Sequence, residues 1–284
     1  MAERYRPQLT NAARPATFEV EAYNERGEMV PTSIAGEHPL TLYLDKREIV
    51  TLMTLGHAPE ALAIGYLRNQ RLVDSIEAIA AVQVDWETDS VVVITRKRAK
   101  GIVRKLGKRT VTTGCGQGTV FGDLMEEIDK VKLRDDVVLT DGQLFDLVDK
   151  VRKYETIYKQ AGAVHGCALA ASTGVASAEI LMFIEDVGRH NAVDAIAGAM
   201  WLDSIDGSDK IFYTTGRLTS EMVIKCAQMR IPFLVSRSGL TQMGHQIAQQ
   251  VGLTMLGRAS GRHYLAFTGQ HRLQRVLPQA TAIA

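Results

Sequence analysis

The sequence predicts an α/β protein, with a three-layer C-terminal domain around a central, mostly parallel sheet and a smaller N-terminal α+β domain. Its 284 residues are about twice the usual size of one domain. Short β-rich runs dominate the first third, whereas strand-like and helical segments alternate from residue 163 onward. Hydrophobic residues make up 46% of the chain and charged residues 23%, a balance typical of a globular protein with a large buried core.

The N-terminal part is expected to form a small α+β domain over residues 17–135. Residues 1–16 contain two prolines and little periodicity, which predicts a disordered tail. One helix, over 60–69, follows Pro59, whose missing N–H does no harm in a first helical turn. The domain ends in a basic segment and the glycine-rich loop of Cys115. The β-rich runs are 18–23, 40–44, 48–53, 80–86 and 91–95.

The C-terminal domain is expected over residues 136–270, followed by a tail over 271–284. Its first helix should begin at Thr140, because Thr140 and Gln143 form a capping-box pattern. The alternating strands and helices after it are typical of β-α-β units, so the sheet should be mostly parallel with helices on both faces. The expected strands are 163–171, 179–185, 210–214, 232–235, 253–256 and 263–267, and the expected helices are 190–202, 219–229 and 241–250.

Charge and hydropathy limit the partners of the protein. Lysine and arginine total 33 against 32 acidic residues, a net charge of +1, which does not give the global basic field of a protein that coats nucleic acid or an anionic membrane. No apolar run approaches the roughly 20 residues that span a bilayer. No secretory segment opens the chain, so a cytoplasmic location is expected. The three cysteines are too far apart for a local zinc site or a disulfide framework, and no structural metal is expected.

One cysteine stands in a composition that exposes its side chain. Cys115 has three glycines within three residues, whereas Cys167 and Cys226 stand among apolar residues and are expected in the core. Eight lysines and arginines precede Cys115 over 96–109 with no acid between them. Such a field favours the thiolate, which is the nucleophilic form, unless the cations only solvate a hairpin. A nucleophilic pair of Cys167 with His165 is an alternative on spacing alone.

A second group of candidate residues follows successive strands of the C-terminal half. In an open parallel sheet the loops after the strands gather at the carboxyl edge, and each loop here introduces a helix N-terminus that can hold an anion. Three such loops each carry one arginine beside glycine or hydroxyl residues, and a fourth basic segment follows, which predicts a pyrophosphate or nucleotide site. The candidate binding residues in these loops are Arg189, His190, Gly216, Arg217, Ser220, Ser236, Arg237, Ser238, Arg258 and Arg262.

Several familiar chemistries are disfavoured by missing motifs. Neither a Walker A sequence nor G-x-G-x-x-G is present, which argues against an ordinary ATPase or dehydrogenase. The H-x-E and P-C-x-x-C elements of zinc deaminases are absent, since His165 is followed by Gly166 and Cys167. Asp186 and His190 could form the acid/base pair of a nucleotide-binding hydrolase, although such residues more often cap a helix or order a loop.

Three long motifs occur in order along the C-terminal half: EDVGRHNAVD over 185–194, TGRLTSEM over 215–222 and IPFLVSRS over 231–238. Together they resemble the FdhD family, the sulfur carrier proteins needed for formate dehydrogenase activity. The likeness extends from about Val20 to Phe267. It implies a cytidine-deaminase-like C-terminal domain without zinc, a smaller N-terminal domain and a homodimer.

The resemblance also implies a function. Members of the family are sulfurtransferases in which a cysteine persulfide, here on Cys115, receives sulfur from a cysteine desulfurase. The sulfur passes to molybdenum (or tungsten) bis(molybdopterin guanine dinucleotide) before this cofactor enters the formate dehydrogenase apo-enzyme, and GDP would mimic part of the cofactor. The resemblance also extends the binding surface to the whole segment Leu256, Gly257, Arg258, Ala259, Ser260, Gly261 and Arg262. Many members carry C-x-x-C at this loop, whereas Gly118 stands in the second position here, so Cys115 acts alone unless Cys167 or Cys226 reaches it. A chaperone that binds cofactor and apo-enzyme without moving sulfur is a further alternative.

Overall fold

The centre of the molecule is a six-stranded sheet with the order β12-β11-β13-β14-β15-β16. The computed structural model describes residues 5–97, 110–111, 118–119, 128, 130–154 and 156–275. The strands of this sheet are β11 His165–Gly174, β12 Ser177–Asp186, β13 Lys210–Thr214, β14 Phe233–Ser236, β15 Thr254–Ser260 and β16 His263–Thr268.

The sheet is mixed, so the prediction of a mostly parallel sheet is wrong. Only β13, β14 and β15 run parallel to one another, whereas β11 pairs antiparallel with β12 and β13, and β16 pairs antiparallel with β15. The connections explain the difference. Residues 175–176 and 261–262 are too short for a crossover and can only turn the chain back as hairpins, whereas helices follow β12, β13 and β14.

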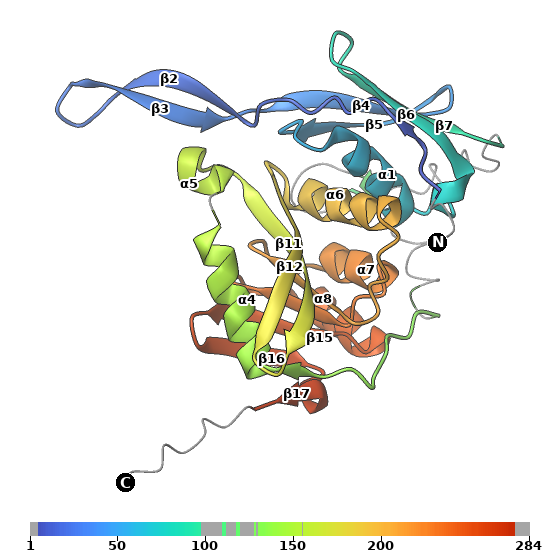
Figure 1. Ribbon diagram of the computed structural model, residues 1–284, viewed down its shortest axis with the longest axis vertical. Helices are drawn as coiled ribbons and strands as arrows, with labels where there is room; N and C mark the ends of the chain where they lie inside the picture. Colours follow the sequence, from blue (N-terminus) through green and yellow to red (C-terminus); the bar gives the residue numbers. More distant parts are fainter. Residues whose placement is uncertain are drawn as a thin grey trace.

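Both faces of the sheet are covered, which confirms the α/β class (Figure 1). Successive residues of β11 point to opposite sides. Cys167 and Leu169 point to the side that is covered by three helices, and Ala168 and Ala170 point to the side that is covered by one. The three helices are α6 Arg189–Leu202, α7 Ser220–Gln228 and α8 Gln242–Val251, and the single helix is α4 Asp141–Lys153.

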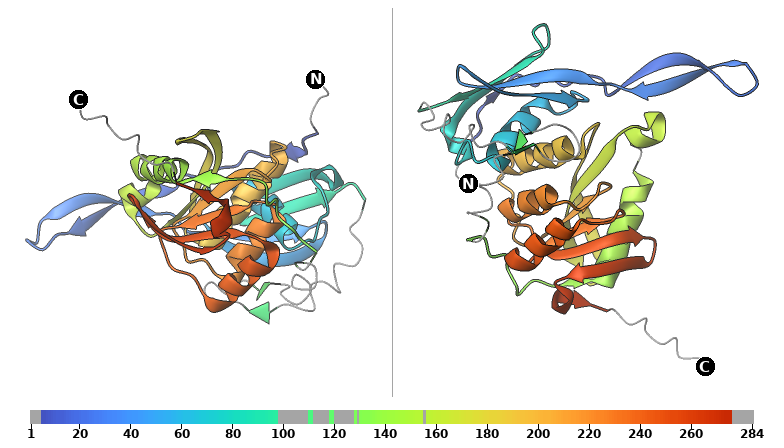
Figure 2. Two further views of the ribbon diagram at one scale, coloured as in Figure 1. Left: turned by 90° about the horizontal axis from the view of Figure 1, so that it is seen from below. Right: turned by 180° about the vertical axis from the view of Figure 1, so that it is seen from behind.

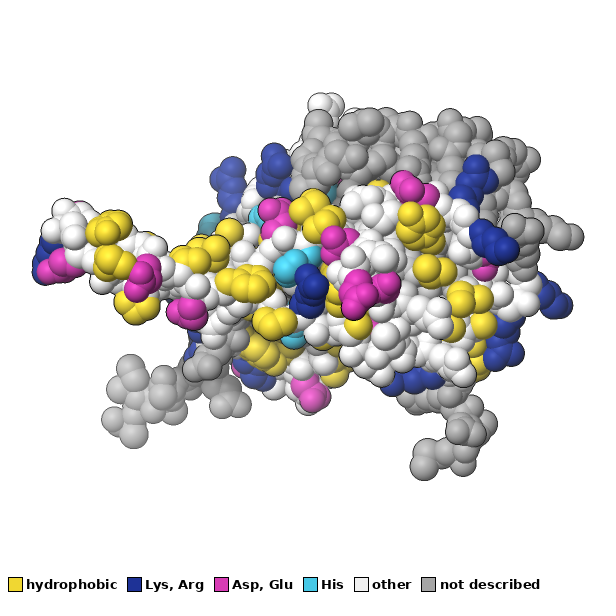
Figure 3. All heavy atoms as spheres, turned by 90° about the horizontal axis from the view of Figure 1, so that it is seen from above, with side chains coloured by type: hydrophobic (Ala, Val, Ile, Leu, Met, Phe, Trp, Pro, Cys, Tyr) yellow, Lys and Arg dark blue, Asp and Glu magenta, His cyan; other side chains and the backbone are white. Residues whose placement is uncertain are grey.

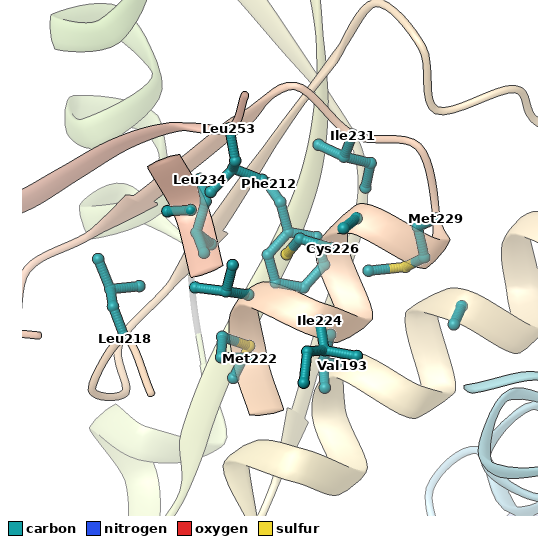
Figure 4. Packing of buried hydrophobic residues seen from close by; sticks show 14 of the residues in the cluster. Val193, Phe212, Leu218, Met222, Ile224, Cys226, Met229, Ile231, Leu234 and Leu253 are labelled. Atoms are coloured by element: carbon teal, nitrogen blue, oxygen red, sulfur yellow. The ribbon is translucent and has the colours of Figure 1, made fainter. Parts of the chain in front are cut away.

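The apolar layer between the sheet and the helices α6, α7 and α8 is the larger of these two clusters. Figure 4 shows Phe212 and Leu234 of the strands facing Val193 and Ile224 of the helices. Cys226 lies among them and is fully buried, as the sequence predicts. The capping box at the start of α4 is also confirmed: the Thr140 hydroxyl accepts the Gln143 N–H at 3.1 Å, and the Gln143 side chain accepts the Thr140 N–H at 3.0 Å.

A second sheet, with the order β1-β6-β7-β4-β5, forms most of the N-terminal part and packs on helix α1 Pro59–Asn69. A 3-10 turn, η1 Ile76–Ala78, leads into this sheet. Its strands are β1 Gln8–Leu9, β4 His38–Leu44, β5 Arg47–Thr54, β6 Ile79–Asp85 and β7 Ser90–Thr95.

The expected N-terminal tail is part of this fold over its described residues 5–16. Strand β1 pairs with Ala81 and Val82 of β6, and the Tyr5 hydroxyl donates to the Ile79 carbonyl. The prediction of a disordered segment is therefore wrong from residue 5 onward. A two-residue strand has no periodicity that a sequence pattern could reveal.

A hairpin of β2 Thr17–Tyr23 and β3 Met29–Ala35 projects from the body of the molecule (Figure 1 and Figure 2). Hydrophobic side chains stand among acidic ones along it when the molecule is seen from above (Figure 3). Phe18 and Ile34, which face each other across the hairpin, are 44% and 46% exposed. This arm therefore leaves much of its apolar surface uncovered in the single chain.

The other end of the chain is also ordered beyond the expected boundary. Strand β10 Leu139–Thr140 pairs in parallel with β17 Leu273–Gln274, which follows the 3-10 turn η2 Gln270–Arg272. The Arg272 side chain is only 1% exposed and donates to the Arg134 carbonyl at 2.6 Å. The predicted tail from residue 271 is thus wrong over 271–275, because a buried arginine, not an apolar pattern, fixes this segment.

The N-terminal part is joined to the central sheet by an unusually close helix crossing. An added Cβ at Gly65 of α1 would lie 1.7 Å from the Asp194 carbonyl oxygen, and one at Gly198 of α6 would lie 1.9 Å from the Ala61 carbonyl oxygen. These two glycines let the helix backbones touch. Because residues of α6 also pack in the N-terminal cluster, the two parts share one helix, and a domain division at 135/136 stays a prediction.

Two smaller elements complete the description. The five-residue helix α5 Ile157–Ala161 lies beside the β2–β3 arm, and the short strands β8 Thr110–Val111 and β9 Gly118–Thr119 pair antiparallel. None of the helices in the described ranges is long and apolar enough to cross a membrane.

Candidate functional site

The loops after β13 and β14 meet at the carboxyl edge of the central sheet, as the sequence predicts. The Ser236 hydroxyl donates to the Gly216 carbonyl at 2.6 Å and accepts the Ser238 N–H at 2.9 Å. Strand β15 is joined to the loop after β14, since the Arg258 N–H donates to the Ser238 carbonyl at 2.9 Å. These bonds fix three chain segments against one another, and the resulting edge is a rigid frame for a site.

A cavity of about 380 Å³ opens at this edge, on the side of α4. Arg237, Ala259 and Ser260 line it, so the structure brings these three candidate residues together. Two lining residues that the sequence reasoning missed are Thr215 and Tyr158. Thr215 stands directly after β13 and could have been included with its loop, whereas the position of Tyr158 in α5 has no sequence signal.

A group of basic residues adjoins this cavity around His165. Burial is the largest cause that lowers the pKa of His165, and the nearby charges of Arg189, Arg237 and Arg217 lower that pKa further. The His165 ring also lies 3.4 Å from the Thr215 hydroxyl, which lines the cavity. The three predicted arginines therefore all lie near enough to His165 to affect its pKa, although they come from three loops.

The arginines of this group differ in exposure. Arg189 is the first residue of α6 and is 5% exposed, and an added Cβ at Gly216 would lie 2.7 Å from its Cδ atom, so glycine is needed there to admit the side chain. Arg217 and Arg237 are exposed, and among the described residues neither forms an ion pair with a carboxylate. This positive, polar edge suits a ligand with several phosphate oxygens.

The wall of the cavity next to α5 depends on Glu185, a further residue that the sequence reasoning missed. Its carboxylate accepts the Ile157 N–H at 2.7 Å and the Tyr158 N–H at 3.1 Å. The guanidinium carbon of Arg237 lies 5.3 Å from the centroid of the Tyr158 ring. Glu185 opens the first long motif of the sequence, which is the signal that could have drawn attention to it.

Other candidate residues lie outside the cavity. Arg262 lines a different cavity, where its guanidinium carbon is 5.1 Å from the centroid of the Phe145 ring. Leu256 is buried in the sheet, and an added Cβ at Gly257 would lie 2.9 Å from the Phe267 ring. Ser220 begins α7, Arg258 is exposed, and Gly261 has a positive φ in the turn after β15.

Asp186 and His190 do not form an acid/base pair. The Asp186 carboxylate accepts from the Thr54 hydroxyl at 2.5 Å and from the Asn191 amide at 2.9 Å, which joins the end of β5 to the start of α6. His190 instead lies 3.4 Å from the Glu221 carboxylate. Burial lowers the pKa of His190 to about 3, so the ring is neutral at pH 7 despite this contact. The hydrolase alternative loses its proposed proton-transfer pair.

The two described cysteines are inert by position, as the sequence predicts. Both Cys167 and Cys226 are fully buried, burial raises the pKa of Cys167 to about 12, and burial also raises that of Cys226. The Cys167 thiol donates to the Thr214 hydroxyl at 3.3 Å, so it forms no nucleophilic pair with His165. Cys115 lies outside the described residues.

The fold as a whole is similar to a solved structure, that of a candidate formate dehydrogenase accessory protein from Desulfotalea psychrophila. The two structures align with a TM-score of 0.72 over 92% of this chain and 100% of that chain, at 24% sequence identity. At this identity the likeness defines the class of fold alone.

The sequence comparisons define the family. The family model described as FdhD/NarQ family matches residues 35–274, and the chain therefore belongs to this family. Curated relatives named sulfur carrier protein FdhD include that of Listeria monocytogenes, 29% identical over 90% of this chain and 95% of the relative. Those of Wolinella succinogenes and Sulfurisphaera tokodaii are each 28% identical, over 84% and 88% of this chain and 81% and 95% of the relatives.

Proposed function

We propose that this protein is a sulfur carrier that accepts sulfur as a persulfide on Cys115 and transfers it to molybdenum (or tungsten) bis(molybdopterin guanine dinucleotide) for formate dehydrogenase. The observation that carries the proposal is the carboxyl-edge cavity lined by Arg237, with Arg189 and Arg217 near His165 beside it. A phosphate-bearing cofactor needs such donors, fixed in direction by a rigid frame. Membership of the FdhD/NarQ family supports the sulfur half of the proposal.

The sulfur step requires an accessible thiolate. Cys167 and Cys226 are buried and stay protonated, so the role falls to Cys115. The Cys115 thiolate attacks the outer sulfur of the persulfide on the desulfurase, a new S–S bond forms, and the donor cysteine leaves as its thiolate. With Gly118 in place of a second cysteine, no disulfide can form within this loop when the sulfur leaves.

The cofactor is the substrate that receives the sulfur. Its pyrophosphate oxygens would accept charge-assisted hydrogen bonds from Arg217 and Arg237, while Ala259 and Ser260 line the same cavity. A cytidine-deaminase-like arrangement is supported by the strand order β12-β11-β13-β14-β15, with β11 antiparallel to the next strand. The desulfurase, the formate dehydrogenase apo-enzyme and a second copy of the chain are the proposed partners.

The deciding experiment is intact-mass analysis after incubation with a cysteine desulfurase and cysteine. The wild type should gain one sulfur atom, Cys115→Ala should gain none, and Cys226→Ala should load normally if it folds. Loading that persists in Cys115→Ala would contradict the assignment of the carrier thiol. GDP binding without any sulfur loading would instead favour a chaperone that only holds the cofactor.

A further inference from the structure

Helix α5 needs an anchor outside itself. It has five residues, Ile157–Ala161, none of which is buried. Helices shorter than roughly 12 residues are marginal in water even with good helix formers. One local support is the cap, since the Thr156 hydroxyl accepts the Lys159 N–H at 3.3 Å. A single cap of this kind does not hold such a helix in one orientation.

Glu185 supplies the anchor from the central sheet. It lies near the end of β12, opposite Gly166 in the antiparallel register, and is 7% exposed. Its two carboxylate oxygens accept the first two N–H groups of α5, Ile157 at 2.7 Å and Tyr158 at 3.1 Å. A carboxylate is favoured at a helix N-terminus by the orientation of the peptide dipoles, and bonds to an ionised acceptor are stronger than neutral ones.

The anchor determines where the Tyr158 ring lies. Tyr158 lines the cavity and is half exposed, with the Arg237 guanidinium 5.3 Å from its ring centroid, within the range of a cation–π contact. Among the described residues no carboxylate pairs with Arg237, so the ring is the group that restricts this arginine. If α5 moved, Arg237 would have no fixed neighbour at the cavity.

We propose that Glu185 is a positioning residue of the ligand cavity: by holding α5 it places Tyr158 under Arg237, and Arg237 is thereby oriented toward the phosphates of the ligand. This inference rests on the proposed function, because it takes a nucleotide-bearing ligand as the occupant of the cavity. It adds to that function a residue that lines the cavity and acts on the ligand by holding α5 in place.

The first test measures the anchor without ligand. Backbone amide exchange at Ile157 and Tyr158 should speed up by an order of magnitude or more in Glu185→Gln, because an amide side chain has one acceptor oxygen in place of two. Glu179→Gln is the matched control, since Glu179 is an exposed residue of the same strand. Unchanged exchange in Glu185→Gln would overturn the positioning role.

The second test measures GDP binding by calorimetry. Tyr158→Ala should weaken binding roughly two- to fivefold, the range expected for one exposed cation–π contact, whereas Tyr158→Phe should bind like the wild type. Glu185→Gln should weaken binding to a similar degree, and combining it with Tyr158→Ala should add little further loss. Fully additive losses would show that Glu185 does not act through Tyr158.

The two tests separate the positioning role of Glu185 from the proposal that the cavity binds a nucleotide-bearing ligand. A wild type that binds no GDP would remove the proposed ligand from this cavity. Amide exchange still reports on whether Glu185 holds α5 in that case. Exchange that speeds up in Glu185→Gln while GDP binding stays equal to wild type would overturn the link from α5 to the ligand.

Discussion

Two groups of charged residues each include a residue of α6, Arg189 in one and Asp194 in the other, and they are built in opposite ways. The first is buried between α1, α6 and α7. The Lys225 ammonium lies 2.8 Å from the Asp194 carboxylate and 3.5 Å from that of Glu221, and the Asn69 amide donates to Asp194 at 2.7 Å. The second is the arginine group at the carboxyl edge.

The two groups differ in whether their charged side chains have partners of opposite charge within the protein. In the buried group each ion has a partner of opposite sign inside the protein, so nothing is left for a ligand. At the carboxyl edge Arg217 and Arg237 are exposed and have no carboxylate partner among the described residues. A cluster whose ions are paired with one another serves the fold, whereas exposed cations without a paired carboxylate are suited to bind an anion.

The largest expected effect is on the buried group. Lys225→Met should lower the free energy of unfolding by about 3 to 5 kcal/mol, because it leaves buried carboxylates without their cation. Lys46→Met, at an exposed turn, is the control and should change stability by less than about 0.5 kcal/mol. Urea unfolding checks both variants. Similar stabilities would mean that the buried ion pairs contribute nothing to the fold.

A smaller effect is expected at the carboxyl edge. Arg237→Ala or Arg217→Ala should weaken GDP binding by roughly tenfold or more, since each charged hydrogen bond is worth on the order of 1.5 to 3 kcal/mol. Stability should be unchanged, because both side chains are exposed. Arg262→Ala tests the boundary of the site: Arg262 lines another cavity and should affect GDP less. Calorimetry with no loss in either of the first two variants would remove the site from these loops.

The sequence motifs alone could not separate the two groups. The motif over 215–222 contains both Arg217, at the edge, and Glu221, in the buried network. Likewise the motif over 185–194 begins with Glu185, which anchors α5, and ends with Asp194, which pairs with Lys225. Each motif runs from a strand end or a loop into a helix, and only the packing of other elements decides which of its side chains are buried.

Local patterns did predict the elements with regular periodicity. The capping box at Thr140 and the burial of Cys226 follow from neighbouring residues, and the structure confirms them. The predicted strand directions were wrong because the length of a connection decides whether it forms a hairpin or a crossover. That length depends on where the strands end, and strand ends are hard to place from a sequence. Tyr158 was missed for a third reason: its place beside Arg237 is set by Glu185, 27 residues away in the chain.

The smallest expected effect is a dependence of GDP binding on pH through His165. Burial is the main cause that lowers the pKa of His165 below its usual value of about 6.5, and the charges of Arg189, Arg237 and Arg217 lower this pKa further. The other groups near the ring are the Thr215 hydroxyl, Asp186 opposite it on β12, and the neutral His190. An anionic ligand on the arginines would offset their positive charge and raise the pKa of His165.

The sign of the effect follows from linkage. If the pKa of His165 is higher in the complex than in the free protein, binding takes up a fraction of a proton, and affinity rises as the pH falls through the window between the two pKa values. Because GDP titrates in the same region, the comparison is between the wild type and His165→Asn. Calorimetry in two buffers of different ionisation enthalpy near pH 6.5 should show greater proton uptake for the wild type. Equal uptake by the two proteins would place the phosphates away from His165, and hence away from the point where the three arginines converge.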